Sequence, residues 1–244
     1  MNKSASDAPP PYSTVVFDCD STLSSIEGIE ELVPENSPEL EELTAAAMNG
    51  EVPLEAVYGR RLQLARPTEI AVRAVGKRYI ETALENSKAV ISALRALKKR
   101  VLIVSGGLLP PVAELGLHLG VPREDIHAVD IHFDAAGNYA GFEEESLLAR
   151  AGGKLDLLER IAPAAPVVLV GDGATDLEAA SRCARFVAFG GVVRRETVFA
   201  AAPVQITESN FAALLPLLFS SDEIAHLKTL PAHANLVDAA EPWL

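Results

Sequence analysis

The sequence predicts an α/β fold, in which a doubly wound, mostly parallel sheet carries a small all-helical cap domain as an insertion. Short apolar runs alternate with helical patterns along most of the chain, which indicates a parallel sheet covered by helices on both faces. Between residues 24 and 87 the pattern changes. Apolar residues there recur at three- and four-residue spacing, prolines separate the pieces, and no strand pattern is convincing. We therefore expect one sheet domain interrupted by a helical segment.

The expected elements follow this order along the chain. Strands are expected at 14–17, 101–104, 167–170 and 185–189, with a hairpin in the stretch DIHFDAAGNYAGF. Helices are expected at about 87–99, 110–119 and 153–161, after 171 and from 194, and in SDEIAHLKTL near the C-terminus. The resulting division is a disordered tail at 1–13, a core at 14–23 and 88–220, a helical cap at 24–87, and a C-terminal extension at 221–244.

Composition and charge limit the classes of function. The chain has 244 residues, 49% hydrophobic and 23% charged, which is the balance of an ordinary globular protein. Its net charge of −13 argues against a nucleic-acid or anionic-membrane surface, and it requires local positive charge wherever an anion binds. No run approaches the roughly 18 apolar residues of a membrane span. Two distant cysteines fit a reduced, cytoplasmic setting, and Cys19 is expected to be a small buried residue rather than a reactive thiol.

Three strand candidates end in polar or glycine-rich sequence: FDCDST, VSGG and VGDGATD. The carboxyl ends of parallel strands meet at one edge of a sheet, so these segments are expected to share a cleft. They bring four carboxylates there, from Asp18, Asp20, Asp172 and Asp176. Carboxylates in one cleft repel one another unless a cation joins them, and an oxygen-only ligand set suits a hard divalent ion, with Mg²⁺ first.

The same cleft contains groups that suit a phosphate. The candidates are backbone amides beside glycines, one hydroxyl and one ammonium group: Gly106, Gly107, Gly171, Gly173, Ser105 and Lys154. Each motif alone also occurs in ordinary turns or on solvated helices. Their ordered occurrence after successive strands favours a phosphate site built around Mg²⁺.

These motifs resemble the four ordered motifs of the haloacid-dehalogenase superfamily, and within it the phosphoserine phosphatases are the most similar group. The resemblance covers roughly residues 14–218, and the helical insertion is similar to the small cap domain of that family. The matching residues are Asp18, Asp20, Ser21, Thr22, Ser105, Gly106, Gly107, Lys154, Gly171, Asp172 and Asp176.

The resemblance implies a role for each motif residue. Asp18 would attack phosphorus and form an aspartyl-phosphate, and Asp20 would act first as acid and then as base. Mg²⁺ would be held by Asp18, Asp172 and the backbone carbonyl of Asp20. The phosphoryl oxygens would bind at Ser105, Gly106, Gly107 and Lys154, while Asp176 would orient Lys154 and the waters of the metal, and Thr175 would line the site.

The resemblance also implies how the substrate is selected. In phosphoserine phosphatases a cap glutamate holds the amino group and a cap arginine holds the carboxylate, which here correspond to Glu27 and Arg61, with Met48 and Leu54 in the pocket wall. Without the resemblance, both charged residues would be interpreted as solvated helix residues. Leu54 stands where the family usually has Phe, and Val192 where relatives often have Asn, which puts strict selectivity for phosphoserine in doubt.

The leading hypothesis is a Mg²⁺-dependent hydrolase of O-phospho-L-serine, monomeric or homodimeric, with no nucleic-acid or membrane partner. The first alternative is the same chemistry on another small phosphomonoester, or transfer of its phosphoryl group to an acceptor. The second is a phospho-acceptor signalling module, against which the cap and the second acid at Asp20 argue, because both serve turnover. A binding protein with an inactive site is the least favoured, because no motif residue is missing.

Overall fold

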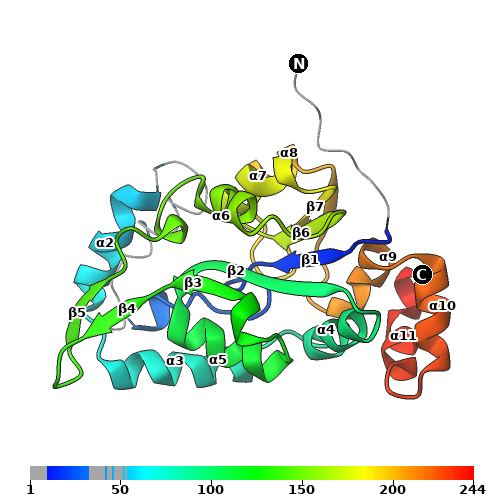
Figure 1. The fold of residues 1–244 in the computed structure, drawn as a ribbon, viewed down its shortest axis with the longest axis horizontal. Coiled ribbons are helices and arrows are strands. Elements are labelled where there is room, and N and C mark those ends of the chain that lie inside the picture. The colour runs from blue at the N-terminus through cyan, green and yellow to red at the C-terminus, as the bar shows by residue number, and fades with distance from the viewer. Residues whose placement is uncertain (1–9, 33–41, 43–45, 47–51, 53) are drawn as a thin grey trace.

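The computed structural model describes residues 10–32, 42, 46, 52 and 54–244 (Figure 1). Within these ranges six parallel strands form one sheet in the order β3-β2-β1-β6-β7-β8. The strands are β1 (Thr14–Phe17), β2 (Arg100–Leu108), β3 (Ile126–Val129), β6 (Val167–Gly171), β7 (Arg185–Phe189) and β8 (Val204–Ile206). A separate antiparallel hairpin is formed by β4 (Ile131–Phe133) and β5 (Tyr139–Phe142). The predicted mostly parallel α/β fold is confirmed.

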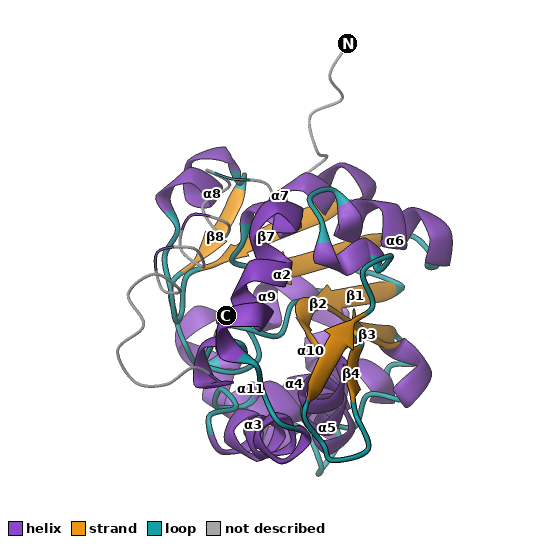
Figure 2. Ribbon diagram, turned by 90° about the vertical axis from the view of Figure 1, so that its left-hand side faces the viewer, coloured by secondary structure: helices purple, strands orange, loops and turns teal. Residues whose placement is uncertain are grey.

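Helices cover both faces of the sheet (Figures 1 and 2). One face carries α3 (Glu69–Glu81), α4 (Ser87–Ala96) and α5 (Leu109–Leu119). The other face carries α6 (Gly153–Ile161), α7 (Ala174–Ala179) and α8 (Glu196–Ala201). Helix α2 (Leu54–Ala65) lies beside the hairpin, where the rings of Tyr58 and Phe142 are 5.1 Å apart.

The strands are apolar on both sides because each face of the sheet has its own core. Along β1, Val15 and Phe17 pack into the cluster under α4 and α5, whereas Val16 packs into the cluster on the opposite face. Successive side chains of a strand point to opposite faces, so a strand covered on both sides is apolar along most of its length. The charged residues Asp18, Asp20 and Asp172 come only after β1 and β6 have ended.

The expected strands and the hairpin are present, and the structure adds two strands that the sequence patterns did not predict. These are β3 and β8, which lie at the two edges of the sheet and have only four and three residues. Such short segments give too few residues for a period of two to be recognised. The SGG segment was expected to follow its strand, but β2 continues to Leu108 and its register with β3 shifts between Val104 and Leu108.

Both chain ends contribute to the core. The extension forms α10 (Ser221–Thr229) and α11 (Ala234–Ala240), and the second of these was not predicted. Leu236, Val237 and Ala240 of α11 are buried in the same cluster as β1. Residues 1–9 of the predicted tail lie outside the described residues, but Tyr12 is buried and its carbonyl accepts a hydrogen bond of 2.8 Å from Lys99. The last residues of the predicted tail therefore pack on the core.

The two connections between the core and the helical insertion lie side by side. Ser24 and Ala83 form an antiparallel bridge, and the hydroxyls of Ser24 and Thr82 are 2.7 Å apart. Helix α3 lies against core helix α5 (Figure 1). Gly76 of α3 makes room for α5, because a Cβ atom there would lie 2.1 Å from a carboxylate oxygen of Glu114. Residues 33–41, 43–45, 47–51 and 53 of the predicted helical segment 24–87 fall outside the described residues.

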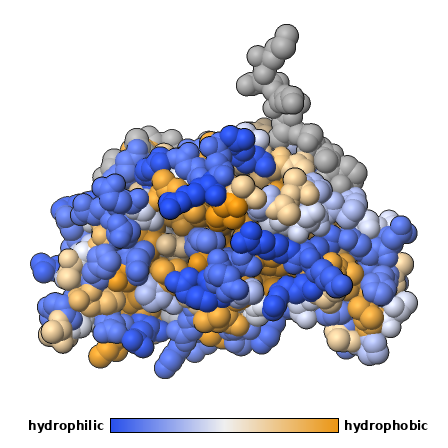
Figure 3. Space-filling model, in the orientation of Figure 1, coloured by the Kyte–Doolittle hydropathy of each residue, from blue (hydrophilic) through white to orange (hydrophobic). Residues whose placement is uncertain are grey.

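The described surface fits the composition of the chain. The face shown in Figure 3 is largely hydrophilic, with separate apolar areas between charged residues. None of the helices among the described residues has both the length and the apolar character that a bilayer crossing requires.

We predict that Gly153→Ala destabilises the protein and Gly59→Ala does not. A Cβ at residue 153 would lie 1.6 Å from the backbone carbonyl oxygen of Leu147, so the first turn of α6 has to move, at a cost of about 1–3 kcal/mol. Residue 59 lies within α2, where a Cβ would make only ordinary contact with Phe142 at 3.5 Å and Ala would gain about 0.5–1 kcal/mol. Urea unfolding of both variants measures the difference, and equal stabilities would contradict the close contact at residue 153.

Candidate active site

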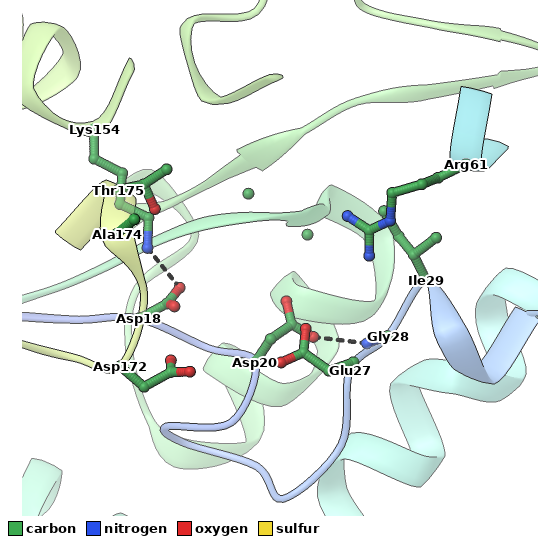
Figure 4. Close-up of a pocket in the computed structure, with 12 residues that line it drawn as sticks. Asp18, Asp20, Glu27, Gly28, Ile29, Arg61, Lys154, Asp172, Ala174 and Thr175 are labelled. Carbon is green, nitrogen blue, oxygen red and sulfur yellow. Dashed lines mark hydrogen bonds and ion pairs between the residues drawn. The ribbon is translucent and has the colours of Figure 1, made fainter. Parts of the chain in front are cut away.

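One pocket collects most of the predicted site residues at the carboxyl edge of the sheet (Figure 4). Asp18 and Asp20 follow β1, Asp172 follows β6, and Gly106 lies near the end of β2. The expectation that these strand ends share a cleft is confirmed. The residues that line the pocket are Asp18, Asp20, Glu27, Gly28, Ile29, Arg61, Gly106, Gly107, Lys154, Asp172, Ala174 and Thr175.

Lys154 is the cation nearest to Asp18. Its ammonium group lies 2.9 Å from Asp18 Oδ1 and donates a hydrogen bond of 2.7 Å to Asp176 Oδ1. Lys154 is only 4% exposed, and burial alone would lower its pKa, but the negative charges of Asp176 and Asp18 outweigh burial and raise it. The side chain therefore stays protonated beside Asp18.

Asp176 is held on both oxygens, one by Lys154 and the other by the backbone amide of Gly173 at 3.1 Å. It is the third residue of α7, so its carboxylate also satisfies the open N-terminus of that helix. Gly171 makes room for it, because a Cβ there would lie 2.3 Å from the carboxylate carbon. Burial raises the pKa of Asp176 to about 7 against the opposing effect of Lys154.

Asp172 is the buried acid on the other side of Asp18. Its Oδ2 accepts a hydrogen bond of 2.9 Å from Arg195 Nε, and its Oδ1 accepts one of 3.2 Å from the hydroxyl of Thr22. Burial raises the pKa of Asp172, Arg195 opposes that shift, and Asp18 adds to it.

The arrangement of acids suits a hard divalent cation. Asp18, Asp172 and Asp176 are all buried, and each offers a carboxylate oxygen within 4.8 Å of the others. Five acids meet in or beside the described pocket wall, Asp18, Asp20, Glu27, Asp172 and Asp176, whereas the cationic side chains beside them are three, Arg61, Lys154 and Arg195. Since these acids have oxygen ligands to offer and too little positive charge beside them, the residues present fit a metal ion of the Mg²⁺ type.

Asp20 has two different oxygens. Oδ1 accepts hydrogen bonds from the amide of Gly28 at 2.7 Å and from the hydroxyl of Tyr79 at 2.5 Å. Oδ2 accepts a hydrogen bond of 3.3 Å from the hydroxyl of Ser105, whose oxygen in turn accepts one of 2.9 Å from the amide of Gly107. Burial, and then the charges of Glu27 and Asp18, raise the pKa of Asp20 to about 7, so it can both give and take a proton near neutral pH.

Glu27 and Arg61 line the same pocket and come from the insertion. Glu27 Oε1 accepts hydrogen bonds from the hydroxyl of Ser21 at 2.7 Å and from Arg195 at 3.1 Å, while burial raises the pKa of this acid. Arg61 is only 2% exposed, and its Nε has no hydrogen-bond partner among the described residues. Figure 4 shows its guanidinium group directed into the pocket, across from Lys154.

Not every predicted residue can be placed. Thr175, Gly106 and Gly107 line the pocket, and Ser105 is buried beside Asp20. Met48 lies outside the described residues, and Leu54 begins α2 but its side chain is not among the described groups. Cys19 is fully buried in the core, as expected, and burial raises the pKa of its thiol.

Two side chains that contact the predicted site, Arg195 and Tyr79, were not among the predicted residues. Arg195 follows β7, so its position beyond the carboxyl end of a parallel strand was a usable signal. Tyr79 lies within α3, and no feature of its local sequence distinguishes it from a core residue.

Comparisons with known proteins agree with this site. Residues 12–183 match the family model of haloacid dehalogenase-like hydrolases. Phosphoserine phosphatase of Bos taurus is 34% identical over 209 residues, covering 84% of this chain and 92% of its own. That of Drosophila melanogaster is 34% identical over 200 residues, covering 80% of this chain and 74% of its own.

Solved structures of similar fold agree with these sequence matches. A substrate-bound phosphoserine phosphatase complex has a TM-score of 0.73 at 25% identity and covers 86% of this chain and 99% of its own. A phosphoserine phosphohydrolase-like protein from Francisella tularensis has a TM-score of 0.74 at 22% identity, covering 88% of this chain and 99% of its own, and supports the fold. The resemblance drawn from the motifs is confirmed, and the chain belongs to the haloacid dehalogenase-like hydrolase family.

Proposed function

We propose that this chain is a phosphoserine phosphatase that hydrolyses O-phospho-L-serine to serine and inorganic phosphate. The observation that carries the proposal is a single pocket with two kinds of recognition group. Asp18 and Lys154 lie at one side and suit the phosphate, while Glu27 and Arg61 suit an amino group and a carboxylate (Figure 4). The name shared by the relatives from Bos taurus and Drosophila melanogaster supports the same substrate.

In the first displacement an oxygen of Asp18 bonds to phosphorus and the ester bond breaks. A carboxylate that approaches a doubly charged phosphate is repelled, and protonated Lys154 at 2.9 Å from Asp18 opposes this repulsion. The proposal assigns the hydroxyl of Ser105 and the amides of Gly106 and Gly107 to the phosphoryl oxygens, for which the amide of Gly107 would have to give up its hydrogen bond of 2.9 Å to Ser105 Oγ. Asp20 gives its proton to the departing serine oxygen.

In the second displacement water attacks the aspartyl-phosphate, and Asp20 takes a proton from that water. A pKa of about 7 lets the same carboxyl group serve as acid and then as base. Phosphate is released and Asp18 is regenerated as a carboxylate. Asp176 keeps Lys154 in place throughout, since both of its oxygens are already bonded.

The cofactor proposed for this reaction is Mg²⁺. Asp18, Asp172 and the backbone carbonyl of Asp20 would hold it, and it supplies positive charge to the phosphoryl oxygens when bound. The shortage of cationic side chains in the pocket wall supports this assignment.

The proposed division of the chain keeps 24–87 as a cap over a core at 14–23 and 88–220. The paired connections at Ser24 and Ala83 support it, because a cap that excludes water needs two adjacent attachment points to move as a unit. A cytoplasmic setting is proposed as well, and is supported by two cysteines that are free and buried. A monomer or a homodimer fits the proposal.

We predict that Asp18→Asn abolishes turnover of phosphoserine. Asn keeps the shape of the side chain but cannot form the acyl phosphate, so kcat should fall by about 10⁴-fold or more. Phosphate release by purified protein measures this, with Asp156→Asn as control, because Asp156 is a partly exposed acid paired with Arg150 on the surface. Near-native turnover of Asp18→Asn would exclude residue 18 as the nucleophile.

Removal of divalent metal is expected to stop the reaction reversibly. Dialysis against EDTA should abolish phosphate release, because the buried acids then lack the positive charge that the site needs, and added Mg²⁺ should restore it. Isothermal titration of the chelated protein gives a second measurement that does not depend on activity. Binding of Mg²⁺ should be lost in Asp172→Asn, and unchanged binding there would contradict the proposed ligand set.

Selectivity is expected to divide between Glu27 and Arg61. Arg61→Met should lower kcat/KM for phosphoserine by about 10²-fold, while phosphoethanolamine, which lacks the carboxylate, should change little. Glu27→Gln should lower kcat/KM for both of these amines, but not for 3-phosphoglycerate. Arg60→Met is the matched control, since Arg60 is the exposed neighbour. If each variant affects all three esters equally, the assigned contacts are wrong.

A further inference from the structure

Tyr79 connects the helical insertion to the acid–base group of the site. It lies on α3 with no exposed surface, and its hydroxyl donates a hydrogen bond of 2.5 Å to Asp20 Oδ1. The amide of Gly28 donates to the same oxygen at 2.7 Å. Two donors from different elements therefore hold one oxygen of a buried carboxyl group.

The chain around Asp20 is shaped to admit the tyrosine hydroxyl. A Cβ at residue 28 would lie 2.0 Å from the oxygen of Tyr79, so only glycine permits this approach. The chain between Asp20 and Gly28 forms a loop, across which the hydroxyl of Ser21 donates a hydrogen bond to Glu27. Ser21 itself has a positive φ of 51°. The position of Gly28 and that of Tyr79 thus depend on each other.

Helix α3, which carries Tyr79, is capped at its start and contacts Ser24 at its end. At its start, the side chain of Thr68 accepts a hydrogen bond from the amide of Ala71. At its end, the hydroxyl of Thr82 donates to the carbonyl of Arg78 and lies 2.7 Å from the hydroxyl of Ser24. Between these ends α3 packs on core helix α5. Tyr79 therefore reaches Asp20 from a fixed support.

We propose that Tyr79 is a positioning residue for the catalytic acid–base: with the Gly28 amide it engages Asp20 Oδ1 and leaves Oδ2 as the oxygen that transfers protons. Oδ2 accepts a hydrogen bond of 3.3 Å from the hydroxyl of Ser105, a group assigned to the phosphate, so it is the oxygen on the side of the reacting ester. This inference rests on the proposed phosphatase function. It adds which oxygen of Asp20 reacts and what fixes its direction.

In the two displacements Asp20 gives up one proton to the leaving serine and regains one from water. When the ester bond breaks, its electron pair stays on the serine oxygen, which takes the proton from Asp20 Oδ2. When water bonds to phosphorus, Oδ2 takes one of its protons, and the bond between phosphorus and Asp18 breaks to give phosphate and a carboxylate. Tyr79 keeps its own proton, since burial raises the pKa of its hydroxyl.

The test compares Tyr79→Phe with Tyr58→Phe on two substrates. Tyr58 is an equally buried tyrosine of the insertion, but its hydroxyl has no hydrogen-bond partner among the described residues. Phosphoserine has an alkoxide leaving group that needs a proton, whereas the carboxylate leaving group of acetyl phosphate does not. Rapid-quench single-turnover experiments measure formation of the aspartyl-phosphate from each.

Tyr79→Phe should slow phosphoenzyme formation from phosphoserine by about 10–100-fold and from acetyl phosphate by less than about threefold, with KM for phosphoserine little changed. Tyr58→Phe should match the wild type on both substrates. Equal slowing of both substrates by Tyr79→Phe would show a merely structural role, and no slowing would show no role, so either result overturns the inference.

Two further results keep the test decisive. Thermal unfolding checks that Tyr79→Phe is folded, and if it is not, Gly28→Ala is used, because its methyl group displaces the hydroxyl of Tyr79. The same selective loss on phosphoserine is expected there, and its absence counts against the inference. Wild-type protein that forms no phosphoenzyme from either substrate would overturn the proposed function itself, whereas a wild type active on both, with uniformly slowed variants, overturns only the role of Tyr79.

Discussion

Buried negative charge at one edge of the sheet is the constraint on which the rest of the structure depends. Asp18, Asp172 and Asp176 lie within a few ångströms of one another in a region that excludes most solvent. Carboxylates can stay there only if each has a compensating partner. Lys154 and Arg195 are the cations that the fold brings to them, and the remaining deficit of positive charge is what suits the site to a divalent ion and an anionic ester.

The groups of the site come from two parts of the fold. Groups that suit phosphoryl transfer follow strands of the sheet, where packing on both faces fixes the backbone. Groups that suit substrate selection, Glu27 and Arg61, come from the insertion. Arg195 joins the two sets, because one guanidinium group contacts both Asp172 and Glu27. A change in the charge near Asp172 therefore also acts, through Arg195, on Glu27, which is proposed to hold the amino group of the substrate.

Site residues that follow strands of the sheet could be predicted from the sequence, whereas most contacts made by side chains on helices could not. Asp18 and Asp172 were predictable because a parallel sheet forces the residues after its strands to one edge, wherever the strands lie in the chain. No comparable rule predicts which side chains on helices will contact the site. Arg195 meets Glu27 across 168 positions and Tyr79 meets Asp20 across 59, and neither pairing follows from local periodicity. Helix α11 was not predicted for a related reason: its apolar residues pack on a core built from distant parts of the chain, which the local sequence does not reveal.

The position of Asp20 depends on both the sheet and the helical insertion. Its backbone continues from β1, but its carboxyl group takes its direction from Gly28 and Tyr79. Tyr79 belongs to α3, which packs on the core helix α5, whereas Arg61 belongs to α2, which packs beside the hairpin. Arg61 and Tyr79 are therefore held by different contacts, the first through the hairpin and the second through a core helix. The direction of Asp20 and the position of Arg61 thus depend on different packing contacts, although both lie in the same pocket.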